Sequence, residues 1–261
     1  DYETLDGFMR LHKNIEDDEY FLELDKNNLD EEFIYFAYVL NAPQAAGVRG
    51  GAIGQGAVLE FRSFKDGIAL FKKNTNFSNE TDNNIGKADL TNIMEAFLDS
   101  FDIVVEEEDS IVISVNDLFL SETLTSVSPN LPREYRDFVD LDLGKLDSKK
   151  TFINQVRNYP KNTAVEVTFG FSNPQPNQRS AVYAVADARF TSIVARHLFV
   201  EMPDDQFNPR VADQRVGYFS QRVTDLSTYD NYPQRDLINK WRLVKKDPEA
   251  EFSEPVNPIV F

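Results

Sequence analysis

The chain has 261 residues, 41% hydrophobic and 27% charged, which is long and apolar enough to bury a core and excludes a disordered tail. Its 27 Lys and Arg residues stand against 44 Asp and Glu residues, and the formal net charge of −17 repels phosphate backbones and anionic lipids, so we expect no nucleic-acid partner. The absence of cysteine excludes disulfides and thiolate chemistry, and no apolar run reaches the roughly 18 residues of a membrane span.

The first forty residues contain three short segments of strand character. Aromatic and branched residues alternate with polar ones, a pattern that is typical of half-buried strands. The segments are 7–13, 19–24 and 32–40. We interpret residues 1–45 as a small N-terminal strand segment that packs on a main domain formed by residues 46–261.

A cluster of glycines follows the third segment. A dinucleotide-binding loop of the form G-x-G-x-x-G would need a glycine at position 59 and a helix after it, but Leu59 stands there within a strand pattern. The cluster therefore predicts a loop between two strands in which some glycines have positive φ. Its members are candidates for a binding loop: Gly47, Gly50, Gly51, Gly54 and Gly56.

The next segments predict one hairpin and one helix. Residues 58–73 alternate on both sides of Asp66-Gly67, a dipeptide that favours a tight turn. From Leu90 to Phe101 the apolar residues recur with helical spacing, which predicts an amphipathic helix that packs on the core. These apolar residues are Leu90, Ile93, Met94, Phe97, Leu98 and Phe101.

Residues 101–119 return to strand character around an acidic run at 106–109. A calcium loop would alternate its ligands and bend at a glycine, so this run predicts a solvated hairpin tip instead. Residues 146–160 predict a second helix that ends at Pro160. Further strands are expected in the following segments: 162–171, 179–202, 216–226 and 235–246. Together the segments predict an α+β fold, predominantly antiparallel β-sheet with about two amphipathic helices.

The residues of the chain do not suggest a catalytic site. His12 and His197 lie far apart in the sequence, and neither belongs to an H-E-x-x-H zinc motif. There is no G-x-S-x-G motif either. We therefore expect no catalytic residue, metal or cofactor in this chain. Seven arginines lie in the C-terminal third of the chain. They either bind carboxylates through two hydrogen bonds in partly buried places or neutralise nearby acids on the surface: Arg189, Arg196, Arg210, Arg215, Arg222, Arg235 and Arg242.

One arginine-containing stretch, MPDDQFNPRVADQRVGYF at 202–219, resembles a signature of a protein family. It is similar to the non-catalytic amino-terminal region of bacterial zinc-dependent metalloproteases of the metzincin type. Gln214 departs from the proline that is usual there. Other segments match in the same order: 19–24, 47–64, 110–120, 141–171 and 235–261.

The resemblance implies that this chain is an accessory domain and is not itself an enzyme. Zinc, the H-E-x-x-H helix and the hydrolysis of protein or peptide substrates are then expected in a catalytic domain that follows, and a secreted, periplasmic or envelope location is implied. The expected partner is that C-terminal catalytic domain. Candidate interdomain residues are Arg210, Asp213, Arg215, Gly217, Trp241 and Arg242. The alternative is a stand-alone carbohydrate- or peptide-binding module of the bacterial envelope.

Overall fold

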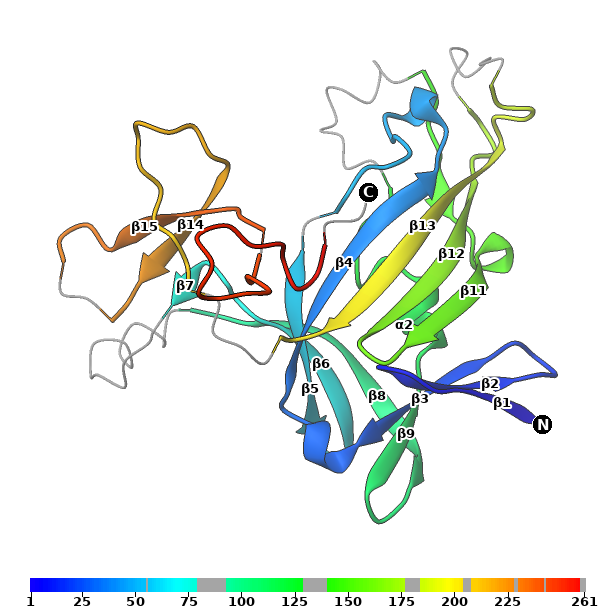
Figure 1. Ribbon diagram of the computed structural model, residues 1–261. Helices are drawn as coiled ribbons and strands as arrows, with labels where there is room; N and C mark the ends of the chain where they lie inside the picture. The colour runs from blue at the N-terminus through cyan, green and yellow to red at the C-terminus, as the bar shows by residue number, and fades with distance from the viewer. Residues whose placement is uncertain are drawn as a thin grey trace. The chain divides into compact units, whose positions relative to one another are not determined.

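The chain forms two compact units in the computed structural model (Figure 1). Unit 1 comprises residues 1–73 and 95–202, and unit 2 comprises residues 74–94 and 203–261. The boundary expected after residue 45 stays a prediction. The residues that the structure describes are 1–54, 56–78, 93–128, 140–176, 184–203, 208–227, 230–241 and 243–258.

Unit 1 is built on a 12-stranded antiparallel sheet, which confirms the predicted β-rich class. The strand order is β1-β2-β3-β9-β8-β6-β5-β4-β13-β12, and β10 and β11 both pair with β12. The strands are β1 (Tyr2–Leu5), β2 (Arg10–Asn14), β3 (Tyr20–Asp25), β4 (Glu32–Asn41), β5 (Ala57–Phe64), β6 (Gly67–Lys72), β8 (Ala96–Glu106), β9 (Ser110–Ser114), β10 (Lys145–Leu146), β11 (Phe152–Tyr159), β12 (Asn162–Ser172) and β13 (Phe190–Glu201).

The core of unit 1 lies against one face of this sheet. Along β12, Val165, Val167 and Phe169 are fully buried and alternate with partly exposed neighbours, as expected for a strand with one face inside. Helix α2 (Asn116–Leu120) packs on the same core. Its Phe119 meets Phe199 of β13 edge to face, with 5.9 Å between the ring centroids.

A seam of hydrogen bonds joins the β1–β2 turn to the β11–β12 hairpin, which lie at opposite ends of the strand order. The Asn158 amide donates to the carbonyls of Leu5 at 2.7 Å and Met9 at 2.5 Å. Its carbonyl oxygen accepts from the Thr163 hydroxyl at 2.5 Å, and that hydroxyl accepts from the Met9 N–H at 3.0 Å. At Gly7 a side chain would collide with Asn158, so only glycine fits beside the seam.

Both predicted helices are wrong. Residues 96–106 form β8 and residues 152–159 form β11, and α2 is the only α-helix among the residues described. A β-bulge explains each error. At Asn154 an extra residue puts Ile153 and Val156, three apart, opposite Val167 and Val165 of β12, which are two apart. A bulged strand can thus show the spacing of a helix.

The second bulge lies in β8, where Asp99 pairs with Leu70 but Phe97 pairs with Phe71. Leu98 is the extra residue, and together with Phe101 it packs on the core at a spacing of three. Leu90, the first residue of the predicted helix, lies outside the described residues. Pairing with β6 therefore takes precedence over the helical pattern from residue 96 onward.

The predicted hairpins are confirmed. β5 and β6 turn at Lys65 and Asp66, with Phe64 paired to Gly67. The acidic run closes the β8–β9 hairpin, where the Glu107 N–H donates to the Ser110 carbonyl at 2.9 Å. No helix in the described ranges has the length and apolar character that crossing a membrane requires.

Unit 2 contains a three-stranded sheet in the order β15-β14-β7. β14 (Ser220–Asp225) pairs antiparallel with β15 (Gln234–Ile238) and parallel with β7 (Phe77–Ser78). These strands are shorter than the predicted segments 216–226 and 235–246. Leu226 is the only buried hydrophobic residue among those described in this unit.

The seam predicts a specific effect on stability. Replacing Asn158 with Ala removes the donor to the Leu5 and Met9 carbonyls and the acceptor of the buried Thr163 hydroxyl, so the free energy of unfolding should fall by about 2–3 kcal/mol in urea titrations. Asn154→Ala, an exposed amide on the same strand, is the matched control and should cost under about 1 kcal/mol. Equal losses of unfolding free energy in the two variants would contradict the claim that Asn158 joins the two hairpins.

Candidate functional site

The glycine-rich segment forms a loop that folds back along β4. Gly47 and Gly51 have φ of 81°, as expected for a glycine loop. The Gly51 N–H donates to the Val39 carbonyl, and the Gly54 N–H donates to the Ala37 carbonyl, both at 2.7 Å. Ile53 pairs with Tyr38 between these bonds, so residues 52–54 form a short strand-like segment beside β4.

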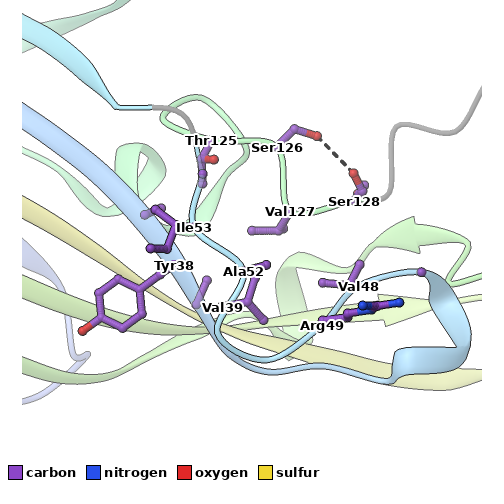
Figure 2. Close-up of a pocket in the computed structure, with 14 residues that line it drawn as sticks. Tyr38, Val39, Val48, Arg49, Ala52, Ile53, Thr125, Ser126, Val127 and Ser128 are labelled. Carbon is purple, nitrogen blue, oxygen red and sulfur yellow. Dashed lines mark hydrogen bonds between the residues drawn. The ribbon is translucent and has the colours of Figure 1, made fainter. Parts of the chain in front are cut away.

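This loop borders a cavity of about 350 Å³ in unit 1 (Figure 2). The floor comes from Ala37 and Val39 of β4 and from Ala195 of β13, and the opposite wall is the segment 125–128. At Gly54 a Cβ would lie 3.2 Å from the Ala37 carbonyl oxygen and 3.6 Å from the Thr125 hydroxyl, so a larger residue would narrow the cavity.

The other predicted loop glycines have different surroundings. Gly47 lines the cavity with Gly54. A Cβ at Gly50 would lie 3.3 Å from the Leu40 carbonyl oxygen, one at Gly56 would lie 3.8 Å from the Tyr35 carbonyl oxygen, and one at Gly51 would meet nothing within 4 Å. Two of the five predicted glycines therefore form the cavity itself.

A single carboxylate holds the wall at 125–128 in place. Glu122 accepts hydrogen bonds from the N–H groups of Val127 at 2.8 Å and Ser128 at 2.6 Å, and from the Ser128 hydroxyl at 3.0 Å. The sequence analysis missed this wall, because the signal is only a glutamate five residues before the first amide that it binds.

Among the described residues that line the cavity, Arg49 is the only charged one, and it is exposed. It has no ion pair or hydrogen bond with a described residue, whereas every other arginine described in unit 1 has at least one. These partnered arginines are Arg10, Arg62, Arg157, Arg189 and Arg196. Arg49 thus brings an uncompensated positive charge to the cavity in a strongly acidic chain.

The predicted interdomain residues lie in unit 2, where Arg215 binds a nearby acid. Its Nε and Nη2 atoms donate to the two carboxylate oxygens of Asp213 at 2.9 and 2.5 Å. This fork lowers the pKa of Asp213 to about 2. Both side chains are exposed, so the pair fixes the local turn more than it stabilises the unit.

Arg210 lies beside β15 through its backbone. Its carbonyl accepts the Ile238 N–H at 2.9 Å, and Val211 forms a bridge with Leu237. A Cβ at Gly217 would meet nothing within 4 Å, and Trp241 is exposed. Arg242 lies outside the described residues. The structure therefore brings Arg215 to Asp213 and Arg210 to β15, and the interdomain role of all six residues stays a prediction.

Unit 2 exposes many large apolar side chains. Phe219 is 90% exposed, Phe252 87% and Trp241 69%. The whole exposed set is Phe77, Met94, Val211, Val216, Tyr218, Phe219, Tyr232, Trp241, Leu243, Val244, Phe252 and Val256. We call this set the apolar surface of unit 2.

A charge network around the buried Glu60, which the sequence analysis missed, lies in unit 1. Arg62 donates to both carboxylate oxygens of Glu60 at 2.5 and 2.9 Å and to Glu95 at 2.6 and 3.2 Å. Lys73 reaches Glu95 at 2.6 Å. Hydrogen bonds from Arg62 lower the pKa of the buried Glu60 and bring that of Glu95 to about 2. Lys73 and Glu95 are the residues at which the chain leaves and re-enters unit 1, so the network holds that junction.

The two histidines lie in different surroundings. His12 contacts Glu23 through Nε2 at 2.7 Å and Thr4 through Nδ1 at 3.0 Å. His197 is fully buried and meets the Tyr35 hydroxyl through Nδ1 at 2.8 Å, while its Nε2 atom has no partner. Within the described ranges, no three His, Asp or Glu side chains are grouped as metal ligands.

Comparison with known proteins gives one family. The family described as Domain of unknown function (DUF5117) matches residues 50–246, which is more than half of the chain. A search of curated proteins and a search of solved structures found no match.

Burial of His197 predicts a pH dependence of stability. Desolvation lowers the pKa of His197 to about 4, while the unfolded side chain titrates near its ordinary value of about 6.5. The unfolded state therefore binds more protons between these values, and stability is lost as the pH falls through them. The free energy of unfolding should drop by about 2 kcal/mol more from pH 7 to pH 5 in the native chain than in His197→Gln. Urea titrations that give parallel losses would show that His197 is not buried in its neutral form.

Proposed function

This chain belongs to the DUF5117 family, and we propose that it is the non-catalytic accessory domain of a bacterial zinc-dependent metalloprotease. In this proposal zinc and the hydrolysis of protein or peptide substrates belong to a separate catalytic domain of the complete protein. That protein is secreted, periplasmic or attached to the cell envelope. The task of this chain is to bind and support the catalytic domain.

The resemblance to metalloprotease amino-terminal regions is the first support. It involves six segments that occur in the same order over nearly the whole chain, from 19–24 to 235–261. The family match covers five of these segments at least in part, since it spans residues 50–246. The link to a protease rests on the segments and not on the family description.

The observation that carries the proposal is the apolar surface of unit 2. In its described residues, this unit buries one hydrophobic side chain, Leu226, and exposes aromatic residues such as Phe219, Trp241 and Phe252. Aromatic side chains are enriched at protein interfaces and supply much of the binding energy there. A partner domain that covers this surface would give unit 2 the core that it lacks.

The charge of one part of unit 2, residues 208–246, suggests what the partner presents, although unit 2 as a whole carries 13 Asp and Glu residues against 9 Lys and Arg residues. Residues 208–246 contain eight Arg and Lys residues and four Asp residues, in a chain whose net charge is −17. A partner surface with apolar side chains and carboxylates at its rim would complement it. The exposed fork of Arg215 and the guanidinium of Arg210 lie in this region. We assign this surface to the catalytic domain of the same protein.

The proposal predicts how the complete protein responds to loss of the aromatic contacts. The double variant Phe219→Ala with Phe252→Ala should speed thermal inactivation of peptidase activity about tenfold or more, because two side chains of an interface are removed. The control is Phe152→Ala with Tyr159→Ala, which removes two half-exposed aromatic side chains of unit 1 and should leave the inactivation rate near that of the native protein.

Two results would count against the proposal in different ways. A complete protein that binds no zinc and cleaves no peptide would refute the protease association. Normal zinc content and activity, with both double variants inactivated at the same rate, would instead refute the assignment of the apolar surface to the catalytic domain.

A further inference from the structure

We propose that the cavity between residues 47–54 and 125–128 binds the carboxyl-terminal end of an extended peptide whose last residue is small and aliphatic. The site lies wholly within unit 1. Peptide binding at this site is a separate function from the proposed accessory role. It is inferred from the free hydrogen-bonding groups, the charge and the apolar lining of the cavity (Figure 2).

A free strand edge is the first argument. Ile53 faces Tyr38, and the flanking hydrogen bonds run from Gly54 to Ala37 and from Val39 to Ala52. In an antiparallel pair, this arrangement turns the N–H and C=O groups of Ile53 itself away from β4. Neither group has a hydrogen bond, and the Ile53 side chain is 75% exposed. Such an edge binds an extended chain by adding a strand.

The charge of Arg49 is the second argument. Among the described residues its guanidinium is unpaired, although the chain carries an excess of carboxylates, so no described side chain of unit 1 uses its donors. A planar guanidinium binds a carboxylate through two parallel hydrogen bonds. One unpaired cation fits a single carboxylate, whereas a polyphosphate would meet a strongly acidic protein.

The residues that line the cavity determine which side chain the last residue of the peptide can have. Small apolar residues form the floor, namely Ala37, Val39 and Ala195, and Val48 and Val127 flank it. The volume of about 350 Å³ is near the lower limit for ligand sites, which leaves room for one or two residues. A peptide that ends in Val or Ala would place its methyl groups on this floor, its backbone along Ile53 and its carboxylate at Arg49.

Calorimetric titration with short peptides tests the inference. The probe is N-acetyl-Ala-Ala-Val with a free carboxyl group, and the comparison ligands are its C-terminal amide, a version with N-methylated backbone amides, and free valine. We expect saturable binding of the acid and at least tenfold weaker binding of each comparison ligand, because each one lacks the carboxylate, the backbone donors or the extended chain.

The matched protein variants are Arg49→Gln and Arg189→Gln. Arg189 is an exposed arginine of unit 1 whose partner is Asp187, so it controls for the loss of one charge. Arg49→Gln should abolish the preference for the acid over the amide while its unfolding midpoint stays at the native value, and Arg189→Gln should keep that preference. The inference is overturned if acid and amide bind alike, if Arg49→Gln keeps the preference, if valine binds as tightly as the peptide, or if no ligand saturates.

Discussion

The hydrogen bonds of Asn158 bring the two ends of the unit 1 sheet together, and the rest of the fold depends on this contact. One side-chain amide satisfies the carbonyls of Leu5 and Met9 while its oxygen holds the Thr163 hydroxyl. Together with the bond from the Phe8 N–H to the Tyr159 carbonyl, these contacts join the β1–β2 hairpin to the β11–β12 hairpin, which would otherwise be two open ends of a long sheet and a risk for aggregation. Gly7 is needed for the same reason, since any side chain there would displace Asn158.

Charge is distributed differently in the parts of the molecule that hold the fold and in the parts proposed to bind. In the charge network of unit 1, Arg62 satisfies Glu60 and Glu95 at once, so removing Arg62 would leave the buried Glu60 carboxylate with Lys73 as its remaining cation. At the cavity, Arg49 is left without an acid. In residues 208–246 of unit 2, basic residues accompany exposed aromatic side chains instead of a core. Unit 1 thus has the features of a rigid scaffold, and unit 2 has the features of the proposed binding surface.

The sequence predicts much of this fold, and its failures have a physical cause. Alternation and the Asp66-Gly67 turn identify the β5–β6 hairpin correctly, because each depends on neighbouring residues. The two helices fail because bulges at Leu98 and Asn154 change the strand period from two to three locally. The same limit applies to the site. Glycine clustering locates the loop, but the unpaired state of Arg49 depends on contacts distant in sequence, which only the fold reveals.

The central claim is that unit 2 is a docking surface for a catalytic domain, while unit 1 is already complete. Hydrogen–deuterium exchange, measured on residues 1–261 alone and on the complete protein, tests it most directly. The account predicts that backbone amides in 208–258 exchange much more slowly in the complete protein, while those of β12 and β13 exchange at the same rate in both. Unchanged exchange throughout 208–258, or new protection confined to unit 1, would contradict the claim.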